Sequence, residues 1–176
     1  MRPNREPIRQ SDQTHFVSTQ TAERHPFFRH ERWATLFLDV IGHYRTGYLL
    51  HAFVLMPDHV HLLVSPQDTL ERVMQNLKGG FSYRAKRELQ WNGEIWQKGF
   101  TDHRIRDAEG FERHIEYIRL NPVRARLCRS PSEYPYGSMT NAESLDPIPQ
   151  RLKPPDIGDS NVRAKARTLQ SLETEH

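Results

Sequence analysis

Residues 56–65 form the stretch Met56-Pro57-Asp58-His59-Val60-His61-Leu62-Leu63-Val64-Ser65, an apolar run that contains two histidines. Side chains two apart on a strand project from one face, about 7 Å apart, so the two histidines would lie on the same side. The intervening valines and leucine would then face a core. The stretch predicts a strand whose second face brings two imidazoles to one metal ion or phosphate. Such pairs also occur on strands that bind nothing, so the site needs further residues from elsewhere.

The segments around this stretch predict a sheet flanked by helices. Residues 14–21 and 48–56 show strand-like patterns, and Pro57-Asp58 predicts the tight turn of a hairpin into 59–65. Apolar residues spaced by three and four predict helices over 28–44 and 68–89, the second weakened at Gly79-Gly80. A further strand is expected over 95–106, followed by a third helix from Ala108.

This order of elements predicts an α+β fold. Strand, helix, strand, strand, helix, strand is the ferredoxin-like arrangement, an antiparallel sheet with helices on one face, and here a C-terminal helix is added. Six of the 12 prolines follow Ser130, and no Phe, Trp or Tyr follows Tyr136. We therefore expect one domain over residues 1–140 and a disordered or weakly ordered tail over 141–176.

Charge is unevenly distributed along the 176 residues. Lys and Arg number 25 against 22 for Asp and Glu, which gives a net charge of +3. Residues 78–129 alone contain 12 basic and 7 acidic residues, a net charge of +5. The basic middle of the chain favours a polyanionic partner, although a solvated helix face explains an excess of this size equally well.

The remaining composition points to an intracellular protein. Cys128 is the only cysteine, which excludes an intramolecular disulfide and favours a reducing compartment. The apolar runs are too short to cross a bilayer, and the first residues are polar, so we expect a cytoplasmic protein with no membrane partner. We find no glycine-rich phosphate loop and expect no nucleotide cofactor.

The third predicted helix carries polar residues that could complete a site. His114, Tyr117 and Asn121 fall on one strip beside its apolar stripe, and Tyr117 and Asn121 are neighbours because they are four apart. Pro122 predicts that the helix ends or kinks at Asn121. If this strip meets the two histidines, the site holds two imidazoles, one amide oxygen and one phenol.

Three blocks of sequence carry a family resemblance. Residues 53–64, 96–103 and 117–125 together resemble the REP-associated tyrosine transposases, which belong to the single-tyrosine HUH transposase superfamily. The resemblance covers about residues 14–136 and rests on three blocks in the right order. It implies that Tyr117 is the nucleophile, that His59 and His61 are paired metal ligands, and that Asn121 is the third ligand, where relatives can carry glutamine.

The resemblance also implies an activity. We expect a metal-dependent endonuclease and strand transferase that cuts single-stranded DNA near a palindromic hairpin through a 5′-phosphotyrosine intermediate. Mixed nitrogen and oxygen ligation suggests Mg²⁺ or Mn²⁺, with tighter binding of Mn²⁺. We expect a monomer or homodimer. The base that activates Tyr117 is not evident, with His114 and His103 as candidates.

DNA contacts are less legible in the sequence than the chemistry. Basic and aromatic residues along the chain are candidates for DNA contacts. Each one alone is more commonly a solvated charge or a core aromatic, and only the whole set suggests DNA binding. The predicted DNA-binding residues are Arg84, Arg87, Trp96, Lys98, Arg104, Arg106 and Arg124.

Two other classes of enzyme also have a His-x-His pair in their active-site motif. A histidine-triad site needs a third histidine where Leu63 stands, and a metallo-hydrolase needs Asp and His where Leu62 and Leu63 stand. The further ligands that these two classes need are therefore missing from this sequence. A regulator that binds single-stranded nucleic acid on the same fold without catalysis stays as the alternative.

Overall fold

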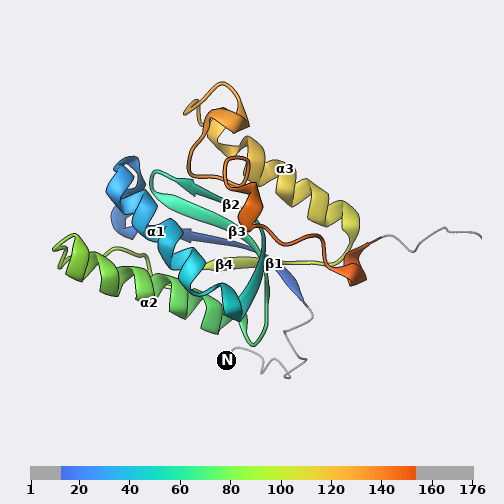
Figure 1. Cartoon of the computed structure of the whole chain (residues 1–176), viewed down its shortest axis with the longest axis horizontal. Coiled ribbons are helices and arrows are strands. Elements are labelled where there is room, and N and C mark those ends of the chain that lie inside the picture. The colour runs from blue at the N-terminus through green and yellow to red at the C-terminus, as the bar shows by residue number, and fades with distance from the viewer. Residues whose placement is uncertain (1–12, 154–176) are drawn as a thin grey trace, which may run out of the picture.

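The computed structural model describes residues 13–153, built around a four-stranded antiparallel sheet (Figure 1). The strand order across the sheet is β2-β3-β1-β4. The strands are β1 (Thr14–Gln20), β2 (Tyr48–Met56), β3 (His59–Pro66) and β4 (Thr101–Ile105). Because β2 and β3 follow one another through the Pro57-Asp58 turn, the predicted hairpin is confirmed.

Helices cover both faces of this sheet. Helices α1 (Glu31–His43) and α2 (Leu70–Glu88) pack on one face, and α3 (Ala108–Arg124) packs on the other (Figure 1). The side chains of Thr69 and Asp107 cap α2 and α3 by accepting hydrogen bonds from backbone N–H groups of their first turns. The predicted α+β class and the added C-terminal helix are confirmed.

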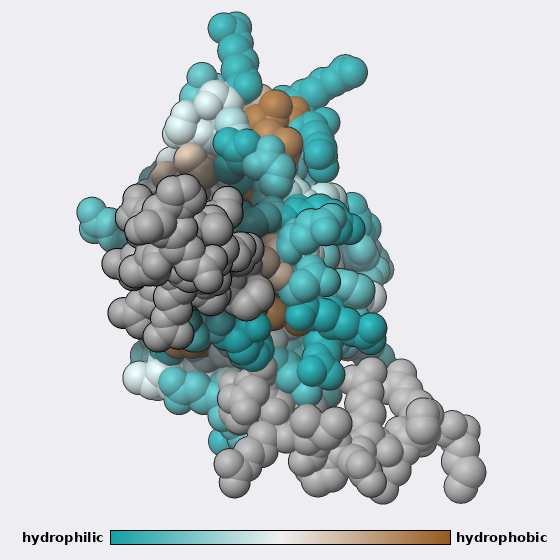
Figure 2. Space-filling model, turned by 90° about the vertical axis from the view of Figure 1, so that its right-hand side faces the viewer, coloured by the Kyte–Doolittle hydropathy of each residue, from teal (hydrophilic) through white to brown (hydrophobic). Residues whose placement is uncertain are grey.

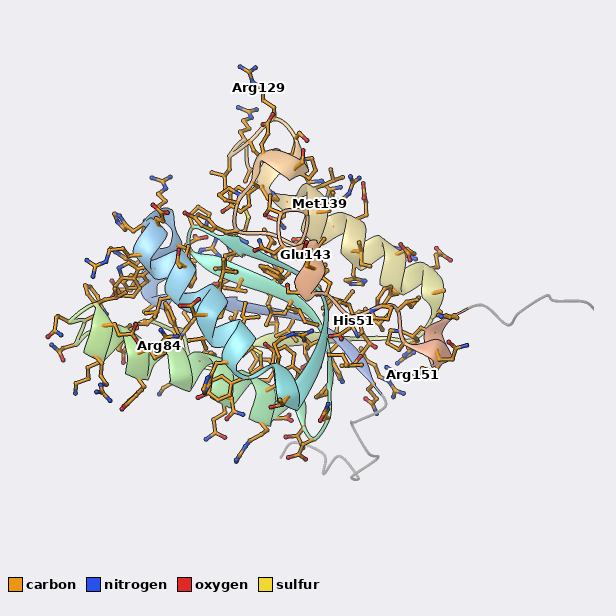
Figure 3. The ribbon with its side chains drawn as sticks, viewed as in Figure 1. His51, Arg84, Arg129, Met139, Glu143 and Arg151 are labelled. Atoms are coloured by element: carbon orange, nitrogen blue, oxygen red, sulfur yellow. The ribbon has the colours of Figure 1, made fainter. Side chains whose placement is uncertain are left out.

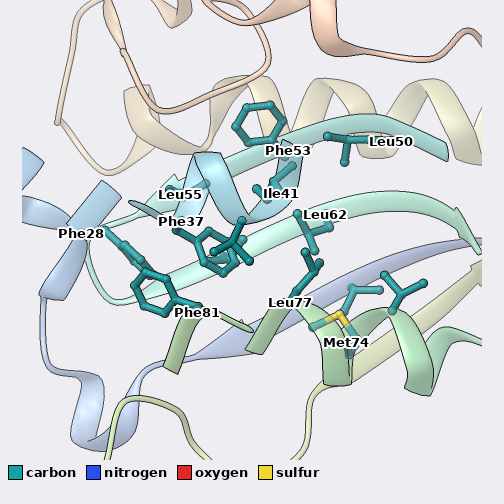
Figure 4. Packing of buried hydrophobic residues seen from close by; sticks show 14 of the residues in the cluster. Phe28, Phe37, Ile41, Leu50, Phe53, Leu55, Leu62, Met74, Leu77 and Phe81 are labelled. Carbon is teal, nitrogen blue, oxygen red and sulfur yellow. The ribbon is translucent and has the colours of Figure 1, made fainter. Parts of the chain in front are cut away.

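The alternation of β3 decides which face carries the histidines. Val60, Leu62 and Val64 are buried in the larger core between the sheet and α1 and α2, part of which Figure 4 shows. Leu63 lies in the second core, under α3. Since side chains alternate along a strand, His59 and His61 share the side of Leu63 and face α3.

A bulge in β2 adds a further residue to the α3 side. Leu50 pairs with Val64 and Ala52 with Leu63, so His51 is the extra residue between two consecutive pairs. The shift lets Leu50 and Phe53 face one core while Ala52 faces the other. His51 lies against Phe111 of α3, with ring centroids 5.3 Å apart.

The strand expected over 95–106 is shorter than predicted. Only residues 101–105 form β4, and Trp96 makes a single isolated bridge to Thr21. Lys78 Nζ donates to the carbonyl oxygens of Gln97 and Gly99, and Gly99 has a φ of +73°. The N–H of Gln97 still donates to the carbonyl of Gln20, but the carbonyls of Gln97 and Gly99 bond to Lys78, so the regular strand begins only at residue 101.

Helix α3 does not end at Asn121 but continues through Pro122 to Arg124. Proline removes only its own N–H from the ladder, and beyond it the N–H of Ala125 still bonds the Asn121 carbonyl. The proline is also buried. Packing of Pro122 and one remaining turn of hydrogen bonds therefore outweigh the local preference against helix.

The first helix begins later than the predicted residue 28. A 3-10 turn over Phe27–Arg29 precedes α1, and both phenylalanines of that turn are buried. Apolar spacing alone does not separate this turn from the helix that follows.

On the face shown in Figure 2, hydrophilic side chains predominate and the apolar ones form small separate patches.

Residues 141–153 belong to the folded domain, so the predicted weakly ordered tail is corrected over this range. Asp146 N–H donates to the carbonyl of Leu50, and the Asp146 carboxylate accepts from Leu50 N–H and Arg45. Leu152 is buried in the core under α3. The outer edge of β2 is thereby covered (Figure 1). Residues 154–176 of the predicted tail lie outside the described residues.

Within residues 13–153, no helix combines the length and the apolar character needed to cross a membrane.

Candidate active site

The structure brings the predicted nucleophile to the predicted metal ligands. The rings of His61 and Tyr117 lie with centroids 5.4 Å apart, and those of His59 and His61 lie 4.8 Å apart. Tyr117 is 38% exposed. His61 and Tyr117, which are 56 positions apart in sequence, thus belong to one cluster. This cluster lies between the turn of the β2–β3 hairpin and α3, with the phenol open to solvent.

Phe16 of β1 is the centre of this cluster, and sequence reasoning missed it. Its ring stacks on His61 at 5.2 Å and meets the ring of Tyr117 edge-on at 5.6 Å. It also contacts His114 at 4.9 Å. Register explains the position, because Phe16 pairs with Leu63 on the α3 side of the sheet. The alternation of residues 14–20 could have indicated this face, but not the contact with α3.

His61 is held in its neutral form. The residue is only 6% exposed, and burial, followed by the charge of nearby His59, lowers the pKa of His61 to about 4. Its Nδ1 atom is buried and has no hydrogen-bond partner among the described residues. A neutral imidazole with an unpaired nitrogen suits metal ligation, which requires a lone pair.

His59 has its tautomer fixed by a carboxylate. Its Nδ1 donates to Asp58 Oδ1 at 2.6 Å, and Asp58 Oδ2 accepts from Arg24 Nε at 2.7 Å. Burial by itself would raise the pKa of Asp58, but the hydrogen bond and charge of His59, with those of Arg24, lower it below its ordinary value. In the neutral ring this hydrogen bond leaves the lone pair on Nε2, where a ligand can bind.

Asn121 lies one turn beyond Tyr117 on α3 and is half-buried. Its amide side chain makes no hydrogen bond within residues 13–153, so the oxygen is available. Over the same residues, no three His, Cys, Asp or Glu side chains gather as a ligand set. The predicted ligand set of two imidazoles and one amide oxygen, from His59, His61 and Asn121, therefore stays a prediction.

The two candidate bases lie beside the cluster. His114 Nδ1 donates to the carbonyl of Gly110, which leaves its Nε2 with the lone pair in the neutral ring. The ring of exposed His103 on β4 stacks on His114 with centroids 5.5 Å apart. His114 and Tyr117 contact the same Phe16 ring, so His114 is the nearer of the two candidates in this chain of contacts.

Among the predicted DNA-binding residues, Arg124 lies at the site. Its guanidinium carbon lies 5.9 Å from the centre of the Tyr117 ring. Arg84, labelled in Figure 3, and Arg87 are on α2, on the face of the sheet opposite α3. Arg84 pairs with Glu88, and Arg87 donates to Tyr83. The structure therefore brings only Arg124 of these three to the nucleophile.

Trp96 is largely occupied by packing. Its ring lies against Phe28, Phe37 and Phe81, and its Nε1–H donates to the carbonyl of Lys78. These contacts give the indole a role in the core and leave its predicted contact with DNA without structural support. The predicted contacts of Lys98, Arg104 and Arg106 stay predictions, and all three side chains are exposed.

Comparison with known proteins places the chain in a class. Residues 10–121 match the family model described as transposase IS200-like, and the chain belongs to that family. The matched region contains His59, His61, Tyr117 and Asn121.

Three individual relatives show similarity to this chain. The chain is 27% identical over 104 residues to the REP-associated tyrosine transposase of Escherichia coli (strain K12), a match covering 56% of this chain and 60% of that protein. It is 29% identical over 129 residues to a putative REP-associated tyrosine transposase of Haemophilus influenzae, covering 61% and 73%. The solved structure of a REP-associated tyrosine transposase bound to a REP hairpin has the same fold, with a TM-score of 0.67 at 22% identity over 90% of this chain and 94% of that one.

Proposed function

We propose that this protein is a metal-dependent endonuclease and strand transferase that acts on single-stranded DNA through a covalent bond to Tyr117. The observation that carries the proposal is the exposed phenol of Tyr117 beside His61, at a ring distance of 5.4 Å. A half-exposed nucleophile next to two histidines fits attack on a large substrate that approaches from solvent.

The residues divide the chemistry between them. The Tyr117 oxygen attacks phosphorus, the bond from phosphorus to the 3′ oxygen breaks, and the products are a 5′-phosphotyrosine and a free 3′-hydroxyl. The phenolic proton passes to a base, for which His114 is the nearest candidate, and the leaving 3′ oxygen takes up a proton. Mg²⁺ or Mn²⁺ held by His59, His61 and the Asn121 oxygen would neutralise charge on the non-bridging oxygens.

The covalent bond makes the reaction reversible. Since the phosphotyrosine keeps the energy of the broken phosphodiester, a second 3′-hydroxyl can displace Tyr117 and rejoin the strands without a nucleotide. Arg124, next to the Tyr117 ring, is placed to contact a phosphate. The fold shared with a transposase bound to a REP hairpin supports a palindromic hairpin as the flanking element of the substrate.

Adduct formation tests the proposal. The full chain is incubated with Mn²⁺ and a labelled single strand carrying a hairpin, and a covalent adduct is expected on a denaturing gel. Tyr117→Phe should abolish the adduct while DNA binding persists. Tyr83→Phe is the matched control, because Tyr83 is an exposed tyrosine on α2, and it should leave the adduct unchanged. DNA binding by wild-type protein without any adduct would instead support a non-catalytic regulator.

The third ligand has its own test. Asn121→Ala should lower the rate of adduct formation at least about 10-fold, because it removes an oxygen from the proposed ligand set. Asn121→Gln retains an amide oxygen and should recover part of the rate, more so at high Mn²⁺. Single-turnover rates measured across a Mn²⁺ titration check this. Equal rates for the alanine and wild-type proteins at all Mn²⁺ concentrations would remove Asn121 from the site.

A further inference from the structure

Asp58 is held at three points by the turn that follows β1. Its Oδ2 accepts from Arg24 Nε at 2.7 Å, and its backbone carbonyl accepts from both the N–H and the hydroxyl of Thr21, each at 2.9 Å. Its Oδ1 accepts from His59 at 2.6 Å. Both carboxylate oxygens and the peptide oxygen of one residue are thus fixed, which determines where the carboxylate lies.

The turn that supplies Arg24 has an unusual backbone. Glu23 and Arg24 have φ angles of +52° and +58°, two consecutive left-handed residues without a glycine. Residues in this region are strained and persist only where surrounding contacts hold them. Here the single hydroxyl proton of Thr21 is shared between the carbonyls of Asp58, at 2.9 Å, and His25, at 2.8 Å, and so closes the turn at its far end. The strained turn places the guanidinium on Asp58.

The two histidines of the site are held differently. His59 has a carboxylate on Nδ1, whereas Nδ1 of His61 has no hydrogen-bond partner among the described residues. A neutral imidazole exchanges its proton between two nitrogens unless a partner selects one. Of the two histidines, only His59 has a carboxylate that selects its tautomer, and that carboxylate is in turn bonded to Arg24.

We propose that Arg24 and Asp58 are positioning residues that lock His59 in the Nδ1-protonated tautomer and keep its Nε2 lone pair ready for the cation. Neither residue touches the cation or the DNA in this proposal. Arg24 orients Asp58, and Asp58 orients the ring and increases its basicity as a ligand. The use of the lone pair rests on the proposed function, but the tautomer does not.

The tautomer is measured directly in metal-free protein. Long-range ¹H–¹⁵N spectra of full-length protein labelled at histidine report which His59 nitrogen carries the proton at neutral pH. Wild type should show Nδ1–H alone, and Asp58→Ala should show a mixture. Arg24→Ala leaves the carboxylate in place and should shift the mixture less. It also serves as the second variant if Asp58→Ala fails to fold.

Cation affinity is the second readout. Titration calorimetry with Mn²⁺ should show a loss of about 10–100-fold in affinity for Asp58→Ala and a smaller loss for Arg24→Ala, with Arg24→Lys between Arg24→Ala and wild type. Glu88→Ala is the matched control, because it also removes an arginine–carboxylate pair, but on α2 across the sheet. It should change neither the tautomer nor the affinity.

Two results would overturn the inference. One is a His59 tautomer that is the same in Asp58→Ala and wild type. The other is an altered tautomer with Mn²⁺ affinity equal to that of wild type, since the lock would then do nothing for the cation. Failure of the proposed function is separate, because it appears as absence of the Tyr117 adduct whatever the state of His59.

Discussion

Among individual residues, Phe16 is the one whose ring holds the candidate site together. Phe16 contacts His61, Tyr117 and His114, which come from β3 and α3. Pairs of aromatic rings at these distances contribute about 0.5–1.5 kcal/mol each beyond the area they bury. Phe16 therefore couples the strand that carries His61 to the helix that carries Tyr117, and its loss should affect geometry more than folding.

Phe16→Leu tests this coupling. The substitution keeps an apolar side chain but removes the flat ring, so we expect adduct formation to slow about 10-fold because the nucleophile is less well oriented. Unfolding stability should fall by about 1–2 kcal/mol. Tyr44→Leu, which changes a half-buried ring at the end of α1, is the control and should lower stability without slowing the chemistry. Single-turnover rates and denaturant unfolding give the two readouts.

At the scale of elements, the approach of α1 to α2 depends on one glycine. A Cβ built on Gly80 would lie 2.6 Å from Cε2 of Tyr44, whereas a Cβ on Gly79 would meet nothing within 4 Å. The pair that weakens α2 in helix propensity thus has two different roles. Gly80 permits close packing of the helices, and Gly79 does not contribute to it.

The pair makes a matched prediction. Gly79→Ala should stabilise the protein by about 0.5–1 kcal/mol through helix propensity alone. Gly80→Ala gains the same propensity but must displace the Tyr44 ring, and we expect a net loss of about 1 kcal/mol. Urea unfolding of both variants against wild type measures the difference. A stabilised Gly80→Ala protein would show that Tyr44 moves away at little cost.

In the molecule as a whole, one chain of hydrogen bonds, buried at its centre, joins three strands to the C-terminal segment. His51 Nδ1 donates to the carbonyl of Asp146, so its Nε2 accepts from the Ser65 hydroxyl. Ser65 in turn accepts from Thr14, and Thr14 accepts from Arg151 (Figure 3 labels His51 and Arg151). Neutral His51 completes this chain, and its protonation would remove the acceptor for Ser65.

Acid should therefore loosen the fold through His51. Burial lowers the pKa of His51 below 6.5 despite its hydrogen bond to Asp146, so the unfolded chain binds the proton more readily. The contribution to stability is fully present above about pH 6.5 and is lost as the pH falls below that value. His51→Gln should show a smaller decrease in unfolding free energy between pH 7.5 and 5 than wild type.

Denaturant unfolding at the two pH values makes this measurement. His43→Gln is the control, because His43 is an exposed histidine on α1, and it should keep the wild-type pH dependence. His51→Gln will itself be less stable at both pH values, so the comparison is of the two differences. An unchanged difference in His51→Gln would assign the acid sensitivity to other groups, such as buried His15 and His61.

Local patterns predicted the elements because backbone geometry sets their periods. The alternation of residues 59–65 and the spacing of Tyr117 and Asn121 identified the strand, the helix and the faces on which the histidines and Tyr117 lie. The 95–106 strand and the end of α3 were predicted wrongly at their limits, since Lys78 bonds to residues 97 and 99 and Pro122 is buried by packing. These contacts come from residues distant in sequence.

The class of fold, the histidine pair and the phenol could all be predicted from the sequence, because each depends on residue type and short-range spacing. Three contacts could not be predicted in this way: α3 lies beside His61, Arg24 reaches Asp58, and residues 141–153 cover the edge of β2. Such contacts depend on sheet register and on which helix face is buried. Strand register and burial are properties of the assembled core, and no single segment specifies them.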